Sequence, residues 1–313
     1  MTEASNLLGD YIRARRERVT PEQVGIPVFG VRRVPGLRRE EVAMLAGISV
    51  DYYLRLEQGR DRNPSAQVLE SLARVLLLND DATAYLLRLG AGEPRRRRRR
   101  PRKETVAPGI AKLVTTLPLP AFVESRYLDI LAANALATAL SPRIAPGANR
   151  LRDVFLDPAE QALHPDWEKA TAVMVAGFRN SVGTDTDDLR FIELVGELSL
   201  ASPRFSRLWA RHDVRVCEGA PVHIDHPQVG DLRLNVERLG AGGTTGQKLV
   251  IYHPDPGSDS ADKLALLASA VRTPAAPRRT TEDATDAVVA HPGVGLQTTL
   301  EIRHSIPAGP SGA

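Results

Sequence analysis

The sequence has few of the features that would indicate a secreted or membrane-bound protein. Its 313 residues contain one cysteine, Cys217, which excludes an internal disulfide and cannot by itself form a thiolate metal cage. The first residues lack the basic-then-apolar pattern of a signal peptide. No apolar run approaches the roughly 20 residues needed to span a bilayer. We therefore expect a cytoplasmic protein that does not associate with a membrane.

Motifs of common enzyme classes are also missing. The HExxH and CxxC spacings of zinc sites do not occur, and neither does the GxSxG turn of serine hydrolases. His223, Asp225 and His226 lie close together, but on a strand His226 would face away from the other two. The glycine-rich segment 240–246 joins two predicted strands, which indicates a hairpin and not a phosphate-binding loop. We expect no metal, no cofactor and no enzymatic activity.

The charge is distributed unevenly along the chain. The net charge is +3, but residues 1–103 hold 21 Lys and Arg against 13 Asp and Glu, whereas the remainder holds 20 against 25. A basic half attracts phosphate, and it is the half that contains the motif described next.

Residues 37–59 predict two short helices joined by a tight turn, the arrangement that places a second helix in the DNA major groove. Gly47 stands where a positive φ is easiest to adopt, and Ser49 is a good N-cap for the second helix. In the first helix Val42, Leu45 and Ala46 form an apolar stripe. We expect Tyr53 and Leu56 of the second helix to pack on Val42 and Leu45.

Flanking segments complete a predicted five-helix unit. A helix over about residues 7–19 precedes the motif. Pro64-Ser65 opens another helix, and Asn79-Asp80-Asp81 caps a last one that ends at Gly90. Five short helices over about 90 residues can bury one small core.

The second motif helix leaves several side chains pointing outward, where base edges are read. Arg55 can bind guanine O6 and N7, and Asp51 can accept from cytosine N4. In the alternative interpretation Asp51 does not bind a base: it stabilises the positive, N-terminal end of the helix dipole and forms an i, i+4 pair with Arg55. Glu57 is expected to make an internal hydrogen bond, since phosphate would repel an outward carboxylate.

Residues 32–42, with Asp51-Tyr52-Tyr53 and residues 56–60, resemble the Xre (Cro/C1-type) helix-turn-helix family, in a subgroup whose second half is an MmyB-like ligand-binding domain. This resemblance implies a DNA-binding transcriptional regulator and includes the long connection from Thr20 to Gly36. By position, Arg39 corresponds to a residue that contacts the backbone and a flanking base. The expected DNA-binding residues are Arg39, Ser49, Val50, Asp51, Tyr52, Arg55 and Arg60.

An arginine-rich linker over residues 91–106 separates the two halves. Arg95–Arg100 runs into Pro101-Arg102-Lys103. A segment with so many neighbouring positive charges cannot fold by itself, because the charges repel one another. We interpret the run as an arm on DNA phosphate, and the alternative is a solvated linker. The candidate phosphate contacts are Arg32, Arg33, Arg38, Arg95, Arg96, Arg97 and Arg98.

Residues 107–271 predict an α+β domain, an antiparallel sheet with helices gathered on one face. Segments 127–134, 157–159, 202–214 and 226–230 resemble the MmyB-like domain, which implies a PAS-like fold and a small apolar or fatty-acid-like ligand. The candidate pocket residues are Asn134, Arg179, Trp209 and His212. Their alternatives are a helix cap, a surface ion pair, a core residue and a structural histidine. Residues 272–313 are expected to be a disordered tail.

Two function hypotheses remain open. The first is a ligand-responsive transcription regulator that binds double-stranded DNA, with a homodimer placing two recognition helices in successive major grooves. The second is a constitutive DNA-binding or protein-interaction factor, antitoxin-like or architectural, with no small-molecule ligand. The size of the second domain and its resemblance favour the first hypothesis.

Overall fold

The computed structural model describes residues 6–28, 32–61, 63–91, 104–216, 219, 221–244 and 246–272. Helices α1 to α13 belong to one compact unit. Arg95–Arg100, Cys217 and residues 273–313 lie outside the described residues, and so do the predictions of an arginine arm and a disordered tail.

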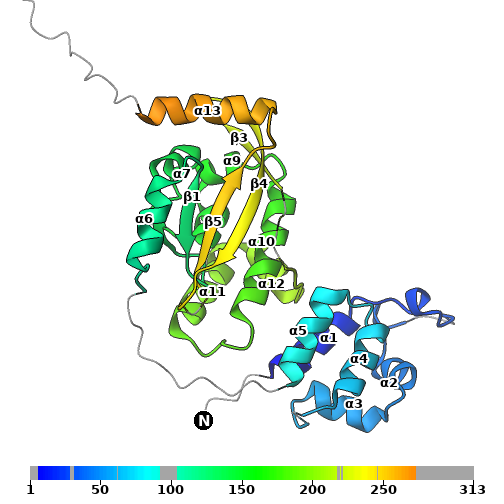
Figure 1. Ribbon diagram of the computed structural model, residues 1–313. Coiled ribbons are helices and arrows are strands. Elements are labelled where there is room, and N and C mark those ends of the chain that lie inside the picture. Colours follow the sequence, from blue (N-terminus) through cyan, green and yellow to red (C-terminus); the bar gives the residue numbers. More distant parts are fainter. Residues whose placement is uncertain are drawn as a thin grey trace, which may run out of the picture. The chain divides into compact units, whose positions relative to one another are not determined.

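The N-terminal part contains the five predicted helices (Figure 1): α1 (Leu7–Arg16), α2 (Arg39–Ala46), α3 (Val50–Glu57), α4 (Ala66–Val75) and α5 (Asp80–Gly90). A 3-10 turn, η1 (Glu22–Val24), lies in the connection after α1. Ser49, Ser65 and Asn79 each accept a hydrogen bond from the backbone N–H three residues further on. Side-chain capping therefore fixes the starts of α3, α4 and α5, as the sequence predicted.

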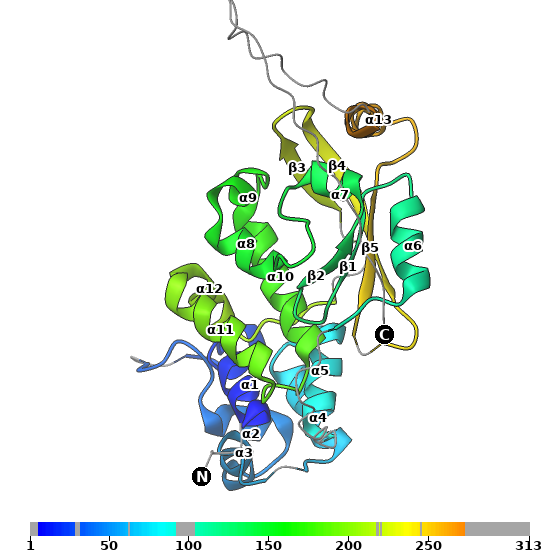
Figure 2. The ribbon, with the colours of Figure 1, turned by 90° about the vertical axis from the view of Figure 1, so that its left-hand side faces the viewer.

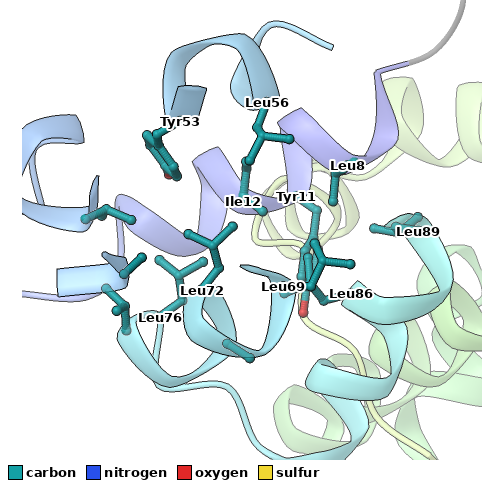
Figure 3. Packing of buried hydrophobic residues seen from close by; sticks show 14 of the residues in the cluster. Leu8, Tyr11, Ile12, Tyr53, Leu56, Leu69, Leu72, Leu76, Leu86 and Leu89 are labelled. Carbon is teal, nitrogen blue, oxygen red and sulfur yellow. The ribbon is translucent and has the colours of Figure 1, made fainter. Parts of the chain in front are cut away.

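One apolar cluster holds these five helices together, with Tyr11, Ile12, Tyr53, Leu56 and Leu72 at its centre (Figure 3). All five of these side chains are fully or almost fully buried.

The predicted packing of α2 is wrong in one position. The buried residues of α2 are Val42, Ala43 and Ala46, while Leu45 is 39% exposed. Compared with the prediction, the buried face of α2 is therefore rotated about the helix axis, so that it includes Ala43 and not Leu45. Because α2 packs closely on α3 and α4, two alanines fit there and the larger leucine lies toward solvent.

The second part is built on a five-stranded antiparallel sheet in the order β2-β1-β5-β4-β3. Its strands are β1 (Ala121–Glu124), β2 (Ile130–Ala133), β3 (Val222–His226), β4 (Gly230–Gly240) and β5 (Lys248–His253). The segment 240–246 joins β4 to β5 as the predicted hairpin.

Eight helices accompany the sheet in the described part of the chain: α6 (Pro108–Thr116), α7 (Ala135–Leu140), α8 (Arg150–Leu156), α9 (Pro158–Ala162), α10 (Trp167–Val182), α11 (Leu189–Ala201), α12 (Pro203–Ala210) and α13 (Asp259–Arg272). The sequence patterns over residues 107–116, 134–140, 167–179, 189–200, 202–213 and 262–272 predict six of these helices, and no pattern predicts α8 or α9. The α+β fold class is confirmed.

Helices cover both faces of the sheet, and not the single face that the sequence predicted. Phe122 packs with Leu140 of α7 and Leu264 of α13, whereas the next residue, Val123, packs with Val114 of α6. Successive strand residues point to opposite faces. Figure 2 accordingly shows α6 on one side of the sheet and α8 to α10 on the other.

Helices α8 and α10 to α12 form a layer with its own aromatic centre. The rings of Phe205 and Trp209 are stacked, with 5.8 Å between their centroids. The ring centroids of Phe178 and Phe191 each lie 5.9 Å from that of Trp209 and 6.2 Å from each other. Two of the four predicted pocket residues, Arg179 and Trp209, lie on α10 and α12 of this layer, and a third, His212, follows the end of α12.

Candidate nucleic-acid interface

The turn between α2 and α3 has the geometry that the sequence predicted. Gly47 has φ +69°, and the N–H of Ile48 donates to the carbonyl of Ala43 at 3.0 Å. The Oγ of Ser49 then accepts from the N–H of Tyr52 at 3.1 Å. A non-glycine residue would be strained at position 47, because L side chains rarely adopt that φ.

Helix α3 has one buried and one exposed side. Tyr53 and Leu56 are buried in the core, whereas Val50, Asp51 and Arg55 are exposed. Val50 and Asp51 lie in the first turn of α3, the end from which such helices contact base edges, and Arg55 lies one turn further on. Arg60, just beyond the helix, is exposed too.

Arg55 is the side chain best suited to bind a base on this surface. Nη1 of Arg55 forms an ion pair with Asp51, and its guanidinium carbon lies 5.7 Å from the ring centroid of Tyr52. The i, i+4 pair of the alternative interpretation is therefore present. Arg55 and Asp51 remain exposed, so the pair leaves both side chains accessible to DNA.

A buried carboxylate fixes α3 against α1 and α2. Glu57 is fully buried, and its two oxygens accept from Nε of Arg16 at 2.7 Å and from Nε of Arg39 at 2.6 Å. Burial would raise the pKa of Glu57, but hydrogen bonds from Arg39 and Arg16 outweigh it and lower that pKa. The predicted internal hydrogen bond of Glu57 is confirmed. Arg39 is thus held at the start of α2 while its side chain stays 44% exposed.

Among the predicted phosphate contacts in the described residues, Arg32 is paired within the protein, whereas the other two are not buried. Arg32 donates to both carboxylate oxygens of Glu41, at 2.7 and 2.8 Å, and to the carbonyl of Gly36. This bidentate pair lowers the pKa of Glu41 and holds the loop before α2 in place. Arg33 and Arg38 are exposed.

A hollow of about 700 Å³ opens beside this loop at the start of α2. Its lining residues are Arg16, Glu17, Val34, Pro35, Gly36, Arg38, Arg39 and Glu40. Three of these lining residues are arginines and two, Glu17 and Glu40, are acidic.

Among the predicted pocket residues, Asn134 has a clear structural role. Its Oδ1 accepts from the N–H groups of Ala137 and Ala121, and its Nδ2 donates to three carbonyls that include that of Leu119 at 2.7 Å. Asn134 therefore caps α7 and joins it to β1, which is the helix-cap alternative.

The other three candidates lie together. Arg179 on α10 stacks on the indole of Trp209 at 3.8 Å, and its Nη1 lies 3.1 Å from Nδ1 of His212. Arg179 is buried, so the surface ion pair considered for it is wrong. Burial lowers the pKa of Arg179 to about 10. Burial, with the charges of Arg179 and Arg15, lowers the pKa of His212 to about 4.

The segment after α12 connects this cluster to the N-terminal helices, which the sequence did not predict. The ring of His212 lies 6.4 Å from that of Tyr11, and Asp213 accepts from Nη1 of Arg15 at 2.9 Å. Val214 is a buried member of the N-terminal apolar cluster. No pattern near residues 211–214 predicts this, because the contacts join positions almost 200 residues apart.

Together these features define a transcription regulator: a helix-turn-helix with an exposed, basic recognition surface, attached to an α+β domain. The helix-turn-helix domain profile matches residues 7–86, and the profile of the MmyB-like transcription regulator ligand binding domain matches residues 106–267. The second match covers more than half of the chain, which therefore belongs to the MmyB-like transcription regulator family.

These domains are those of a regulator and not of an enzyme family. No match was found among curated proteins. Within the described ranges, no helix has both the length and the apolar character needed to cross a bilayer. No three histidine, cysteine or acidic side chains of the described residues are grouped so that they could hold a metal ion.

Proposed function

We propose that this regulator reads a specific DNA sequence through the exposed edge of α3 and that a small apolar or fatty-acid-like ligand in the C-terminal domain changes its affinity for that sequence. Arg55, Asp51, Val50 and Tyr52 contact bases, and Arg39 contacts the backbone beside them. The observation that carries the DNA-binding proposal is that one buried carboxylate, that of Glu57, fixes Arg39 and α3 together.

The ligand part of the proposal rests on the domain match and on the contacts after α12. We place the DNA-binding domain at residues 7–90, the linker at 91–106 and the ligand-binding domain at 107–271. His212, Asp213 and Val214 contact the N-terminal helices, so a shift of α12 on ligand binding would act on α1 directly. Coupling of this kind between two sites is typically about 1–3 kcal/mol.

The experiment has two stages. Selection of bound fragments from random DNA tests sequence recognition, and mass spectrometry of gently purified protein detects a bound amphiphile. The affinity for the recovered fragment is then measured with each member of a panel of straight-chain fatty acids. Recovery of no preferred sequence would reject the DNA proposal. A preferred sequence whose affinity no fatty acid changes, with no bound amphiphile, would favour a constitutive DNA-binding factor.

A further inference from the structure

One carboxylate serves three arginines where the segment after α12 meets the end of α1. Asp213 accepts from Nη1 of Arg15 at 2.9 Å, lies 2.9 Å from Nε of Arg211, and also pairs with Arg18. Nη1 of Arg18 donates to the backbone carbonyl of Arg211 at 3.2 Å as well. Three guanidinium groups from the two halves of the protein therefore share a single negative charge.

A fourth arginine, Arg179 of α10, adds positive charge from the buried side. Arg179 is 6% exposed, and its contacts are the stacked indole of Trp209, the carbonyl of Trp209 and Nδ1 of His212, none of which carries a negative charge. Its Nε has no hydrogen-bond partner among the described residues. The carboxylate whose charge acts on Arg179 is again that of Asp213. Because a buried charge without its own counter-charge is costly, this arrangement favours a further anion.

The other acidic side chains that come near these residues have partners of their own. Glu17 forms its ion pair with Arg16, at 3.6 Å, and the carboxylate of Asp81 accepts from the N–H of Val216 at 2.8 Å. Arg215, next to Val216 in the chain, is exposed and adds another positive charge on that side. Neither carboxylate therefore removes the excess of positive charge around Asp213.

The junction cluster, which we define as Arg15, Arg18, Arg179, Arg211 and Asp213, is accessible at one end. The side chains of Arg18 and Arg211 are 38% and 49% exposed. The Nη2 groups of both arginines have no acceptor in the part of the chain that the structure describes. The cluster thus sets four positive charges against one negative charge and keeps free donors toward solvent.

We propose that the junction cluster binds a dianionic phosphate group of a small molecule, which bridges Arg18 and Arg211. Guanidinium groups suit this ligand, because their planar donors match the oxygens of a phosphate. Arginines that converge on one carboxylate fit a single anionic group, whereas a DNA backbone spreads its charges along a strand. The bound phosphate links α1 to the segment after α12 and so strengthens the contact between the two halves. This binding requires neither DNA nor the fatty-acid-like ligand of the proposed function.

Thermal unfolding of the full chain in potassium phosphate and in potassium chloride, at equal ionic strength, tests the site. Millimolar concentrations are used, because they are too low for the general stabilising effect of phosphate as a salt. Phosphate should raise the unfolding temperature of the wild type in a saturable way, and chloride should not. Arg18→Gln and Arg211→Gln should each weaken the apparent phosphate affinity at least about tenfold, since each removes a charge-assisted hydrogen bond.

Two control variants separate this site from other positive charges. Replacing Arg95–Arg100 by serine removes the densest basic run of the chain and should leave the phosphate response unchanged. Arg233→Gln, at a side chain that is 78% exposed on β4, should do the same.

The ring of His212 gives a local signal, because its Nδ1 lies 3.1 Å from Nη1 of Arg179. Its NMR signals, identified by their loss in His212→Gln, should shift on titration with phosphate in the wild type and not in Arg18→Gln.

Equal effects of phosphate and chloride, a full response in both glutamine variants at the cluster, or loss of the response in the serine variant would each overturn the inference. Weaker binding of random DNA by Arg18→Gln, without any phosphate response in the wild type, would assign the cluster to the DNA backbone instead.

Discussion

Arg16 and Glu57 form a buried ion pair, with Nε of Arg16 2.7 Å from Oε1 of Glu57, and the second carboxylate oxygen holds Arg39. One acidic group thereby joins α1, α2 and the end of α3. A buried pair gains little over apolar packing, but breaking it by removing one partner costs about 3–5 kcal/mol.

Glu57→Gln should therefore destabilise the protein by about 3–5 kcal/mol, because the buried Arg16 would lose its buried counter-charge and keep only the exposed carboxylate of Glu17, 3.6 Å away. Chemical denaturation followed by circular dichroism measures this loss. Glu40→Gln, at an exposed position at the start of α2, is the control and should change the stability little. Equal stability of Glu57→Gln and the wild type would contradict the role assigned to the pair.

Arg55→Ala should cost about 1–3 kcal/mol on the selected DNA sequence and little on random DNA, because a bidentate base contact is sequence-specific. Fluorescence anisotropy with both DNAs measures the difference. Arg74→Ala, at an exposed arginine on α4, should show no such preference. Equal losses on both DNAs would assign Arg55 to phosphate binding, and no loss on either would leave it with its Asp51 pair alone.

Replacing Arg95–Arg100 by serine should reduce the dependence of DNA affinity on salt. For every phosphate that the variant no longer neutralises, the slope of log K against log salt concentration should become shallower by about 0.9. Titrations at several salt concentrations, with the wild type alongside, give the slope directly. An unchanged slope would identify the run as a solvated spacer.

His212 should make the protein less stable as the pH falls. Its pKa is about 4 in the folded protein and close to 6.5 when unfolded. Below about pH 6.5 the unfolded chain therefore binds a proton that the folded protein does not, so the free energy of unfolding decreases until about pH 4.

Thermal unfolding of the wild type and of His212→Gln between pH 8 and pH 5 tests this, where the carboxylates of Glu41 and Glu57 stay ionised. The glutamine keeps a polar side chain beside Arg179 but removes the titration. The stability of the variant should depend less on pH than that of the wild type. Two parallel curves would show that the pKa of His212 is the same in the folded and unfolded states.

Local signals predicted the helix-turn-helix well. Ser49, Ser65 and Asn79 are strong caps, and Gly47 has the positive φ expected of the turn. The prediction that Leu45 is buried was wrong, because Leu45 and Ala43 both fit a helical period. Only the close packing of α2 on α3 and α4 decides which of the two is buried. Helices α8 and α9 were missed since seven and five residues are too few to show a period.

The candidate site was less predictable where it depends on distant contacts. Arg179 looks like a surface residue in sequence, since nothing local indicates that Trp209 and His212 will enclose it. Ser49, Val50, Asp51, Tyr52 and Arg55 lie where α3 and its N-cap place them, unlike the phosphate candidate Arg32. Arg32 itself is paired with Glu41, nine residues away, through a loop whose course the sequence does not specify.

The burial of Val214 among the N-terminal helices bears on how this protein can be divided. A fragment that stops soon after α5 would keep all five helices and the whole reading surface, yet it would lack one apolar side chain of its interior and the carboxylate beside Arg15. Such a shortened protein should be less stable than the same helices in the full chain. The two halves thus share part of their interior and are not independent modules.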